Sequence, residues 1–248
     1  MSQTLVLDLG NSRLKWGLYG NRGWMGFGAT LNSEIGTLAL RDWQNLPRPL
    51  RVVGVNVAGE APRVRVEAQL ARWRIIPQWL TAMSEGAGVT NGYKTPSQLG
   101  ADRWASLVAA RQRASSGDAP PRPAVVINAG TAVTIDALDE EGRFLGGLLV
   151  PGVRLMLRSL AENTAALKVP SGAFADFPDS TPDAIYSGAV HAIVGAIELM
   201  RMRLERDERP TQCFLAGGAA HEIAPHLTGP VAVVDNLVLE GVLILAGS

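Results

Sequence analysis

The sequence predicts an α/β fold, built from layers of sheet and helix and divided into two domains. Apolar runs typical of strands alternate along the chain with amphipathic segments typical of helices. A strand, glycine turn and second strand are predicted near the N-terminus, and a similar pattern returns at residues 125–136. Between them, residues 115–123 are too rich in proline and glycine to continue a helix. We therefore expect an N-terminal domain at 1–115 and a C-terminal domain at 116–248.

The N-terminal pattern carries the clearest chemical signal. An apolar run that begins at Leu5 ends at Asp8, a tight turn starts at Gly10, and an alternating strand through Lys15 follows. Backbone N–H groups in such a turn can bind an anion. A carboxylate before the turn can hold a hydrated metal ion, and a lysine after it can meet phosphate oxygens. An ordinary hairpin turn is the alternative interpretation.

The second pattern, at residues 125–136, has the same layout with one change. It keeps the glycine, as Gly130, and a hydroxyl residue, Thr131, but it has Asn128 where the first has Asp8. Two such turns, one in each domain, are suited to gripping the phosphates of one nucleotide. Taken alone, this turn too is open to interpretation as a plain hairpin.

The remaining elements of the first domain follow from local patterns. After the opening hairpin we expect a strand, a weak helix, a strand, an amphipathic helix and a short strand, at Gly23–Gly28, Ser33–Trp43, Arg51–Val57, Glu60–Trp73 and Arg74–Pro77. A long polar loop, Thr81–Gly100, comes next, and loops of this length are often functional.

A helix is predicted at Ser97–Ala110, with Ser97 as its N-cap. Asp102 and Arg103 fall in its early turns, where the loop brings Tyr93 near. Both have simpler interpretations. Asp102 can be a carboxylate favoured by the helix dipole, and Arg103 a solvated surface cation.

In the second domain, helices and strands alternate after the repeated turn. We expect a strand, two helices with a loop between them, a strand ending in a glycine turn, a last strand and a last helix. They lie at Phe144–Val150, Pro151 to about Ala166, Pro182 to about Arg206, Gln212–Ala216, Val231–Val234 and from Asn236 onwards. Thr181 would cap the second of these helices, with Pro182 in its first turn. The turn at Gly217 and Gly218 would let a flat adenine or ribose approach the backbone, or it is an ordinary strand-to-helix turn.

Composition excludes several classes of function. Lys+Arg and Asp+Glu each number 23, so the formal net charge is zero, which argues against a general binder of nucleic acid or membrane surfaces. Cys213 is the only cysteine, so cysteine-rich metal sites and intrachain disulfides are excluded. Three histidines are not spaced as a metal triad. With no signal-like segment and no apolar run of transmembrane length, a cytoplasmic location is expected.

In combination, four motifs resemble the type III pantothenate kinase family, which includes the Bvg accessory factor proteins. The resemblance covers essentially the whole chain. The motifs are Asp8-x-Gly10-Asn11-Ser12-x-x-Lys15, Tyr93-x-x-Pro96-x-x-Leu99-Gly100-x-Asp102-Arg103-Trp104, Gly130-Thr131-Ala132-x-Thr134-x-Asp136 and Ala216-Gly217-Gly218.

The resemblance implies a two-domain fold of the actin-like, sugar-kinase and Hsp70-like type (ribonuclease H-like), with mixed sheets flanked by helices. It implies ATP-dependent phosphorylation of pantothenate, with Mg²⁺ and K⁺ or NH₄⁺, in a homodimer whose substrate pocket the partner subunit completes. Residues for ATP and its phosphates would be Asp8, Leu9, Gly10, Asn11, Ser12, Arg13, Leu14, Lys15, Gly130, Thr131, Gly217 and Gly218, with Asp8 also at Mg²⁺. Residues for pantothenate would be Tyr93, Gly100, Ala101, Asp102, Arg103 and Thr181, with Asp102 as the base.

The chain departs from the family pattern at Asn128. The family usually has an aspartate at this place, associated with the monovalent cation. An amide keeps an oxygen ligand but loses the negative charge, so we expect weaker K⁺ binding. Two alternatives stay open: a regulatory accessory-factor protein with little turnover, and a phosphatase or other phosphotransferase of the same fold. The Gly100-x-Asp102-Arg103 element argues against the second.

Overall fold

The computed structural model describes residues 3–115, 120–163, 172–205 and 210–247. Contacts divide the chain into two compact units, one from residues 1–109 with 237–248 and the other from residues 110–236. The last helix is thus grouped with the N-terminal half, whereas the sequence placed all of 116–248 together. The physical reason is its apolar packing, described below. The domain boundary itself stays a prediction.

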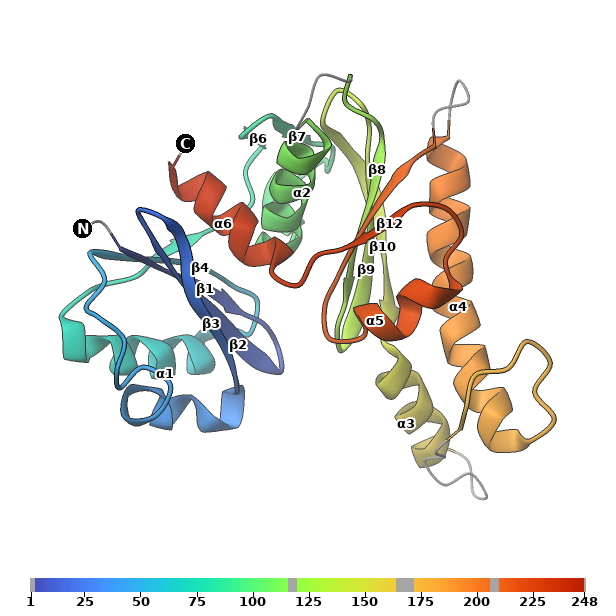
Figure 1. Ribbon diagram of the computed structural model, residues 1–248, viewed down its shortest axis with the longest axis horizontal. Coiled ribbons are helices and arrows are strands. Elements are labelled where there is room, and N and C mark those ends of the chain that lie inside the picture. Colours follow the sequence, from blue (N-terminus) through green and yellow to red (C-terminus); the bar gives the residue numbers. More distant parts are fainter. Residues whose placement is uncertain (1–2, 116–119, 164–171, 206–209, 248) are drawn as a thin grey trace. The chain divides into compact units, whose positions relative to one another are not determined.

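A mixed sheet forms the centre of the first unit (Figure 1). Its strand order is β3-β2-β1-β4-β5, with bounds Gly23–Leu31, Arg13–Gly20, Thr4–Leu9, Arg51–Asn56 and Gln78–Leu80. β1 pairs antiparallel with β2, which pairs antiparallel with β3. On its other side β1 runs parallel to β4, and β4 runs parallel to β5.

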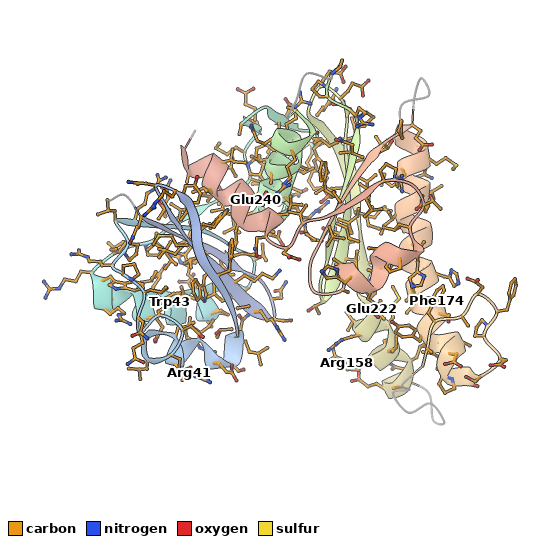
Figure 2. The ribbon with its side chains drawn as sticks, in the orientation of Figure 1. Arg41, Trp43, Arg158, Phe174, Glu222 and Glu240 are labelled. Atoms are coloured by element: carbon orange, nitrogen blue, oxygen red, sulfur yellow. The ribbon has the colours of Figure 1, made fainter. Side chains whose placement is uncertain are left out.

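Alternation along β1 sends its side chains to two different cores. Leu5, Leu7 and Leu9 pack with buried residues of α1 (Glu60–Leu70) and of the 3₁₀ helix η1 (Asn32–Leu40). Trp43, labelled in Figure 2, is fully buried in this core and stacks on Trp73.

The opposite face of the same sheet is covered by α2 (Ala101–Ala114) and α6 (Leu237–Gly247). Val6 packs there with Ala101 and Ala105 of α2 and with Val242 of α6. Strand residues alternate between faces, so Asp8 lies on the same side of β1 as Val6 and faces α2. This packing places the predicted metal ligand on the side of the helix that carries the predicted base.

The second unit repeats the topology of the first. The strand order β12-β11-β8-β9-β10 has the same directions as β5-β4-β1-β2-β3. The bounds are Ala124–Ala129 for β8, Ala132–Leu138 for β9, Arg143–Pro151 for β10, Gln212–Ala216 for β11 and Val231–Val233 for β12. The short sequence echo of the two turns is therefore part of a duplicated fold.

Three helices pack with this second sheet: α3 (Val153–Asn163), α4 (Thr181–Leu204) and the short α5 (Ala220–Ile223), which runs into the 3₁₀ helix η4 (Ala224–His226) (Figure 1). By length and composition alone, α4 could cross a membrane, a property that core helices of soluble proteins share. Val190, Ile193 and Ile197 of α4 are buried in the core of this unit.

Several predicted boundaries are wrong. α2 begins at Ala101 rather than Ser97, because Pro96–Gln98 forms a separate 3₁₀ turn, η3. β5 replaces the strand expected at residues 74–77, where Arg74 is left-handed (φ 55°). The 3₁₀ turn η2 (Ala71–Trp73) follows α1, and the short strands β6 (Glu85–Gly86) and β7 (Val89–Asn91) lie in the expected loop.

Two corrections concern the helices of the second unit. Ser180, not Thr181, caps α4, because its Oγ accepts a hydrogen bond from the Asp183 N–H (3.3 Å). α3 begins at Val153, two residues later than expected. Its expected end near Ala166 lies outside the described residues.

Candidate active site

Asp8 is the most strongly perturbed acid of the site. It sits in β1 directly across from Lys15 in β2 and is 9% exposed. Residues opposite each other in an antiparallel pair share one face, so the ammonium and the carboxylate face the same side. The pKa of Asp8 is raised to about 7, with burial as the largest cause. The nearby charge of Asp102 also raises this pKa, by more than the charge of Lys15 lowers it.

The chemistry around Asp8 fits a hydrated Mg²⁺ ion. No cluster of three or more His, Cys, Asp or Glu side chains suited to a metal occurs among the described residues. Mg²⁺ does not need such a cluster, because it usually keeps several waters and binds one or two carboxylates together with substrate phosphates. A cation beside Asp8 would also favour the ionised carboxylate that burial opposes.

Asp102 lies in the first turn of α2, half-buried. Its Oδ1 accepts a hydrogen bond from the Arg103 N–H (2.8 Å). Burial is the largest influence and raises the pKa of Asp102, against the lowering effects of that hydrogen bond and of the Arg103 charge. The raised pKa means that burial outweighs the N–H groups of the helix N-terminus, which lower the pKa of Asp102; the role of Asp102 as a base stays a prediction.

Gly100 leaves room for this carboxylate. A Cβ atom on Gly100 would stand 2.6 Å from Asp102 Oδ1, well inside the normal contact distance. Any side chain at residue 100 would therefore displace the acid.

Arg103 is not the solvated surface cation of the simpler interpretation. The side chain is 5% exposed, and Nη1 donates to the Tyr93 hydroxyl (3.2 Å). Its guanidinium carbon also lies 5.7 Å from the centre of the Tyr93 ring. The structure thus brings together Tyr93, Gly100, Asp102 and Arg103, four of the residues predicted to bind substrate.

Asn91 organises the loop that carries Tyr93, and the sequence did not single it out for this. Its Nδ2 donates to the carbonyls of Met83 (3.1 Å) and Pro96 (3.2 Å), and its Oδ1 accepts from the Tyr93 N–H (3.1 Å). One side chain thereby ties three parts of the loop together. The sequence signal for this role was an asparagine in a loop rich in glycine and proline, because an asparagine side chain can form hydrogen bonds with nearby backbone groups.

The two predicted phosphate turns have related backbone geometry. The Gly10 N–H donates to the Arg13 carbonyl (3.0 Å), and the Gly130 N–H donates to the Ala132 carbonyl (3.1 Å). The residues at the tips are exposed and accessible to a ligand: Asn11, Ser12, Arg13, Gly130 and Thr131. Each turn is bounded by paired strands on both sides, which restricts its conformation.

Asn128 occupies the place in β8 that Asp8 occupies in β1. It is half-buried and pairs across the sheet with Thr134. An amide and a hydroxyl both offer neutral oxygen ligands, which suits a weakly held monovalent cation better than a divalent one.

Gly217 packs the strand-to-helix turn onto the end of β8. It has a left-handed backbone (φ 100°), and a Cβ atom there would overlap the backbone of Ala129. The Ala219 N–H donates to the Ala129 carbonyl (3.1 Å). The predicted adenosine-side turn therefore lies beside Gly130, while Gly218 has open space where its side chain would be.

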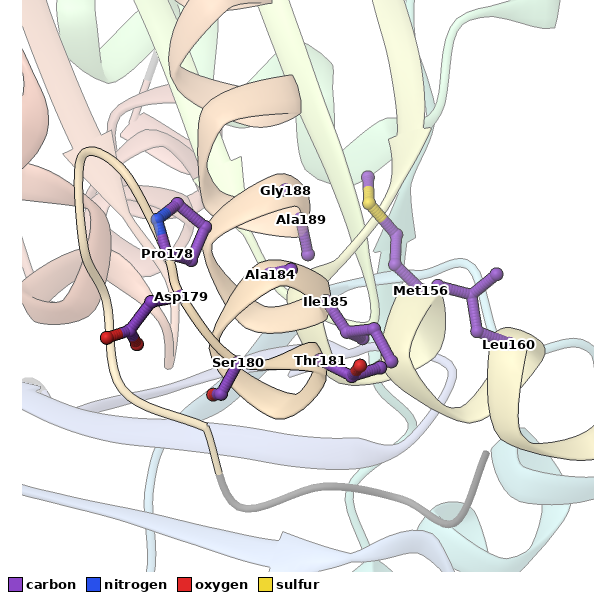
Figure 3. A pocket seen from close by; sticks show the side chains of 10 residues that line it. All are labelled: Met156, Leu160, Pro178, Asp179, Ser180, Thr181, Ala184, Ile185, Gly188 and Ala189. Atoms are coloured by element: carbon purple, nitrogen blue, oxygen red, sulfur yellow. The ribbon is translucent and has the colours of Figure 1, made fainter. Parts of the chain in front are cut away.

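Thr181 is the first residue of α4, and it lines a cavity of ≈ 690 Å³ (Figure 3). The cavity lies beside α3 and the N-terminal turns of α4, with apolar walls that include Met156 and Ile185 and a polar edge at Ser180 and Thr181. An apolar pocket with a few polar groups is typical of small-molecule sites.

Comparison with known proteins decides the family. A model of the type III pantothenate kinase family matches residues 4–203. Type III pantothenate kinases of Leptothrix cholodnii and Nitrosospira multiformis are each 45% identical to this chain over 98% of its length. The matches cover 95% and 90% of those relatives. The chain belongs to the type III pantothenate kinase family.

Solved structures agree on the fold. A Campylobacter jejuni protein described as a Baf family transcriptional activator has a TM-score of 0.65 at 18% identity, with 98% of this chain and 97% of that chain covered. A Sinorhizobium meliloti protein described as a 2-dehydro-3-deoxygalactonokinase has a TM-score of 0.62 at 11% identity, with 99% and 98% covered. These likenesses concern the fold alone. With the duplicated topology, they confirm the predicted actin-like, sugar-kinase-like architecture for this member of the type III pantothenate kinase family.

Proposed function

We propose that this chain transfers the γ-phosphoryl group of ATP to the primary hydroxyl of pantothenate. The product is 4′-phosphopantothenate, and the reaction is the first step of coenzyme A biosynthesis. The observation that carries the proposal is membership of the type III pantothenate kinase family over nearly the whole chain. The Bvg accessory-factor alternative gains nothing from the Campylobacter jejuni structure, because that likeness concerns the fold alone.

Asp102 is the proposed general base. An alcohol is too weak an acid to ionise beforehand, so the base accepts its proton as the O–P bond forms. Partial burial supports this role, because it raises the pKa of Asp102 and makes the carboxylate a better proton acceptor. The proton passes from the substrate hydroxyl to a carboxylate oxygen of Asp102.

Arg103 is proposed to bind the carboxylate of pantothenate. A guanidinium fork can bind a carboxylate with two parallel hydrogen bonds. Tyr93 would fix the plane of the guanidinium through the hydrogen bond to its hydroxyl. Since Asp102 and Arg103 are adjacent in α2, the hydroxyl and the carboxylate of one small substrate could be addressed together.

Phosphate handling is assigned to the two turns and to Lys15. Phosphoryl transfer depends on positioning and on neutralising the charge of the phosphates. Backbone N–H groups of the exposed turns and the Lys15 ammonium would contribute to both. Asp8 would hold Mg²⁺, which supplies further charge neutralisation at the phosphates. Gly217 and Gly218 would lie on the adenosine side.

Three finer proposals complete the function. K⁺ or NH₄⁺ would bind weakly near Asn128, which lacks the charge of an aspartate. The working form would be a homodimer in which Thr181 contributes to the pantothenate site; within its own unit Thr181 lies on the rim of a cavity that none of Tyr93, Asp102 and Arg103 lines. A cytoplasmic location fits substrates that are cytoplasmic metabolites, and no nucleic-acid or membrane partner is proposed.

A coupled assay that follows ADP formation tests the proposal. ADP should form from ATP and Mg²⁺ only when pantothenate is added, and K⁺ is varied in the same experiment. Asp102→Asn should lower kcat by roughly two to four orders of magnitude, as expected when a general base is removed. Its melting temperature and its binding of pantothenate should change little. Pantothenate-independent ATP consumption, or wild-type turnover by Asp102→Asn, would contradict the proposal.

A further inference from the structure

Asn32 is the first residue after β3, and it makes three hydrogen bonds to the first phosphate turn. Its Nδ2 donates to the carbonyls of Gly10 (2.9 Å) and Asn11 (3.0 Å). Its backbone N–H donates to the carbonyl of Ser12 (3.1 Å). Three successive carbonyls of the turn are therefore held by one residue that lies 20 positions further along the chain than Ser12.

These bonds set the direction of the turn's N–H groups. A trans peptide is planar, with its carbonyl and the following N–H on opposite sides. When the carbonyls of Gly10, Asn11 and Ser12 point to Asn32, the N–H groups of Asn11, Ser12 and Arg13 point to the opposite side. Successive N–H groups that share a direction form a nest for an anion.

The corresponding position in the second unit, residue 152, also contacts its turn, but through the backbone of a glycine. Gly152 is the first residue after β10, the strand that matches β3 in the repeated topology. Its N–H donates to the Thr131 carbonyl (2.8 Å), as the Asn32 N–H does to Ser12. A Cβ atom on Gly152 would overlap the carbonyl oxygens of Gly130 and Thr131.

Turn length explains why the two positions carry different residues. Pairing of β1 with β2 ends at Leu9 and Leu14, which leaves the four residues 10–13 in the turn. Pairing of β8 with β9 ends at Ala129 and Val133, which leaves the three residues 130–132. The longer turn leaves space that an asparagine amide fills, and the shorter one lies directly against a glycine.

We propose that Asn32 is a positioning residue for ATP phosphates and that Gly152 is its counterpart at the second turn. The inference rests on the proposed function, because it assigns both turns to phosphate. Asn32 touches the carbonyl side of the turn and so acts through the turn, without contact to the nucleotide. Binding of the polyphosphate chain of a nucleotide should depend on Asn32, whereas binding of adenosine, which has no phosphates, should not.

Global stability should depend little on the Asn32 side chain. Its Oδ1 is buried with no hydrogen-bond partner in the described part of the chain. Asn32→Ala removes two hydrogen bonds, but it also removes this unsatisfied oxygen, and the two effects on folding oppose each other. A loss of phosphate affinity can therefore be separated from a loss of fold.

The test compares Asn32→Ala, Asn32→Asp and the control Gln69→Ala. Gln69 also ties η1 to its surroundings, through a hydrogen bond from the Ala39 N–H to its Oε1 (3.1 Å), and no hydrogen bond joins it to the turn in the described part of the chain. We expect both Asn32 variants to raise KM for ATP and Kd for ADP about tenfold, the factor for roughly one net hydrogen bond. Asn32→Asp keeps the shape but turns a donor into an acceptor that faces two carbonyls. For Asn32→Ala, KM for pantothenate, Kd for adenosine and the melting temperature should stay near wild type. Asn32→Asp should leave Kd for adenosine near wild type but lower the melting temperature, because its carboxylate faces the carbonyls of Gly10 and Asn11. Gln69→Ala should leave all nucleotide constants unchanged.

Gly152→Ala is tested beside Gly195→Ala. Gly195 lies in α4 with open space where its side chain would be, so an alanine there should be harmless. Gly152→Ala should raise KM for ATP, whereas Gly195→Ala should not.

Two results would overturn the inference. One is an unchanged Kd for ADP in both Asn32 variants, and the other is an equal weakening of ADP and adenosine, which would indicate general damage. Direct binding of ADP separates this inference from the proposed function. If the wild type binds ADP but does not phosphorylate pantothenate, the proposed reaction is wrong. The ADP affinities of the Asn32 variants would still show whether Asn32 positions the phosphate turn.

Discussion

Asp8→Asn should make the protein more stable at neutral and alkaline pH while removing its activity. The carboxylate of Asp8 is buried, with the charge of Asp102 close by, and among the described residues Lys15 is the cation that offsets its charge. An asparagine has nearly the same shape but carries no charge to desolvate. It would also be a poor ligand for Mg²⁺, so the kinase reaction should fail.

The magnitude follows from the pKa. In the folded protein the pKa of Asp8 is raised from 3.8 to about 7. At roughly 1.4 kcal/mol for each pKa unit, the ionised form costs about 4 kcal/mol of unfolding free energy. Between pH 3.8 and 7 the folded state keeps a proton that the unfolded state has lost. The contribution of Asp8 to wild-type stability therefore falls as pH rises through this window and is constant above it. The advantage of Asp8→Asn should grow from near zero at pH 3.5 to at most about 4 kcal/mol above pH 7.

Tryptophan fluorescence during urea unfolding can measure this directly. All six tryptophans lie between residues 16 and 104, so the signal reports the unit that contains Asp8. Titrations from pH 4 to 8 should be made with EDTA, because a bound cation would offset the cost. Glu67→Gln is a control for which the change in stability with pH should have the opposite sign. Hydrogen bonds from Arg63 and Trp79 lower the pKa of Glu67, so that variant should lose stability above about pH 4.5.

Refutation would take one of two forms. A difference between Asp8→Asn and wild type that does not change with pH would show that Asp8 titrates as it does in the unfolded chain. A variant that is less stable than wild type at pH 8 would show that the carboxylate makes favourable contacts that outweigh its burial.

Three further changes test other parts of the structure. Arg103→Lys should raise KM for pantothenate about tenfold or more, because the ammonium cannot form the two-pronged bond to a carboxylate, and pantothenol, which lacks the carboxylate, should show no such change. Asn128→Asp should lower the K⁺ concentration needed for half-maximal activity, in a K⁺ titration at fixed Mg²⁺ and ATP, with little effect on KM for pantothenate; identical titration curves would count against a cation at this position. Gly241→Ala should destabilise the protein by about 2 kcal/mol or more, because its Cβ would overlap the backbone of Ala105; Gly247→Ala in the same helix meets open space and should not lower the melting temperature.

Strands near the motifs could be predicted because the patterns that determine them lie within a few residues of each strand. β1, β2, β8 and β9 combine apolar alternation with turns that contain glycine, and the structure confirms all four near their expected places. The order of the strands and the duplication could only be suspected, because pairing between β1 and β4 joins segments that sequence patterns cannot connect. The terminal helix shows the same limit. Its grouping with the first unit depends on Gly241 fitting against Ala105, a contact between distant residues.

The candidate site was predictable as a set of residues but not as an arrangement. Motifs named Asp8, Asp102 and Arg103, whereas their charges and burial depend on how α2 packs over β1. Neither Asn32 nor Gly152 belongs to a motif from which the site was predicted. Each is defined by hydrogen bonds to a turn that lies about 20 residues earlier in the chain.

The duplication gives an argument about why Asp8 is an acid at all. Position 128 in β8 corresponds to position 8 in β1, and there the fold accommodates an asparagine. The architecture of the strand and turn therefore does not require a carboxylate at this place. Since ionised Asp8 costs stability at neutral pH, its presence is not explained by folding. A ligand that binds the charge and repays the cost explains it, and a divalent cation that accompanies phosphates is such a ligand. On this reasoning we predict a divalent cation at Asp8 in the first unit and at most a weakly held monovalent cation at Asn128 in the second.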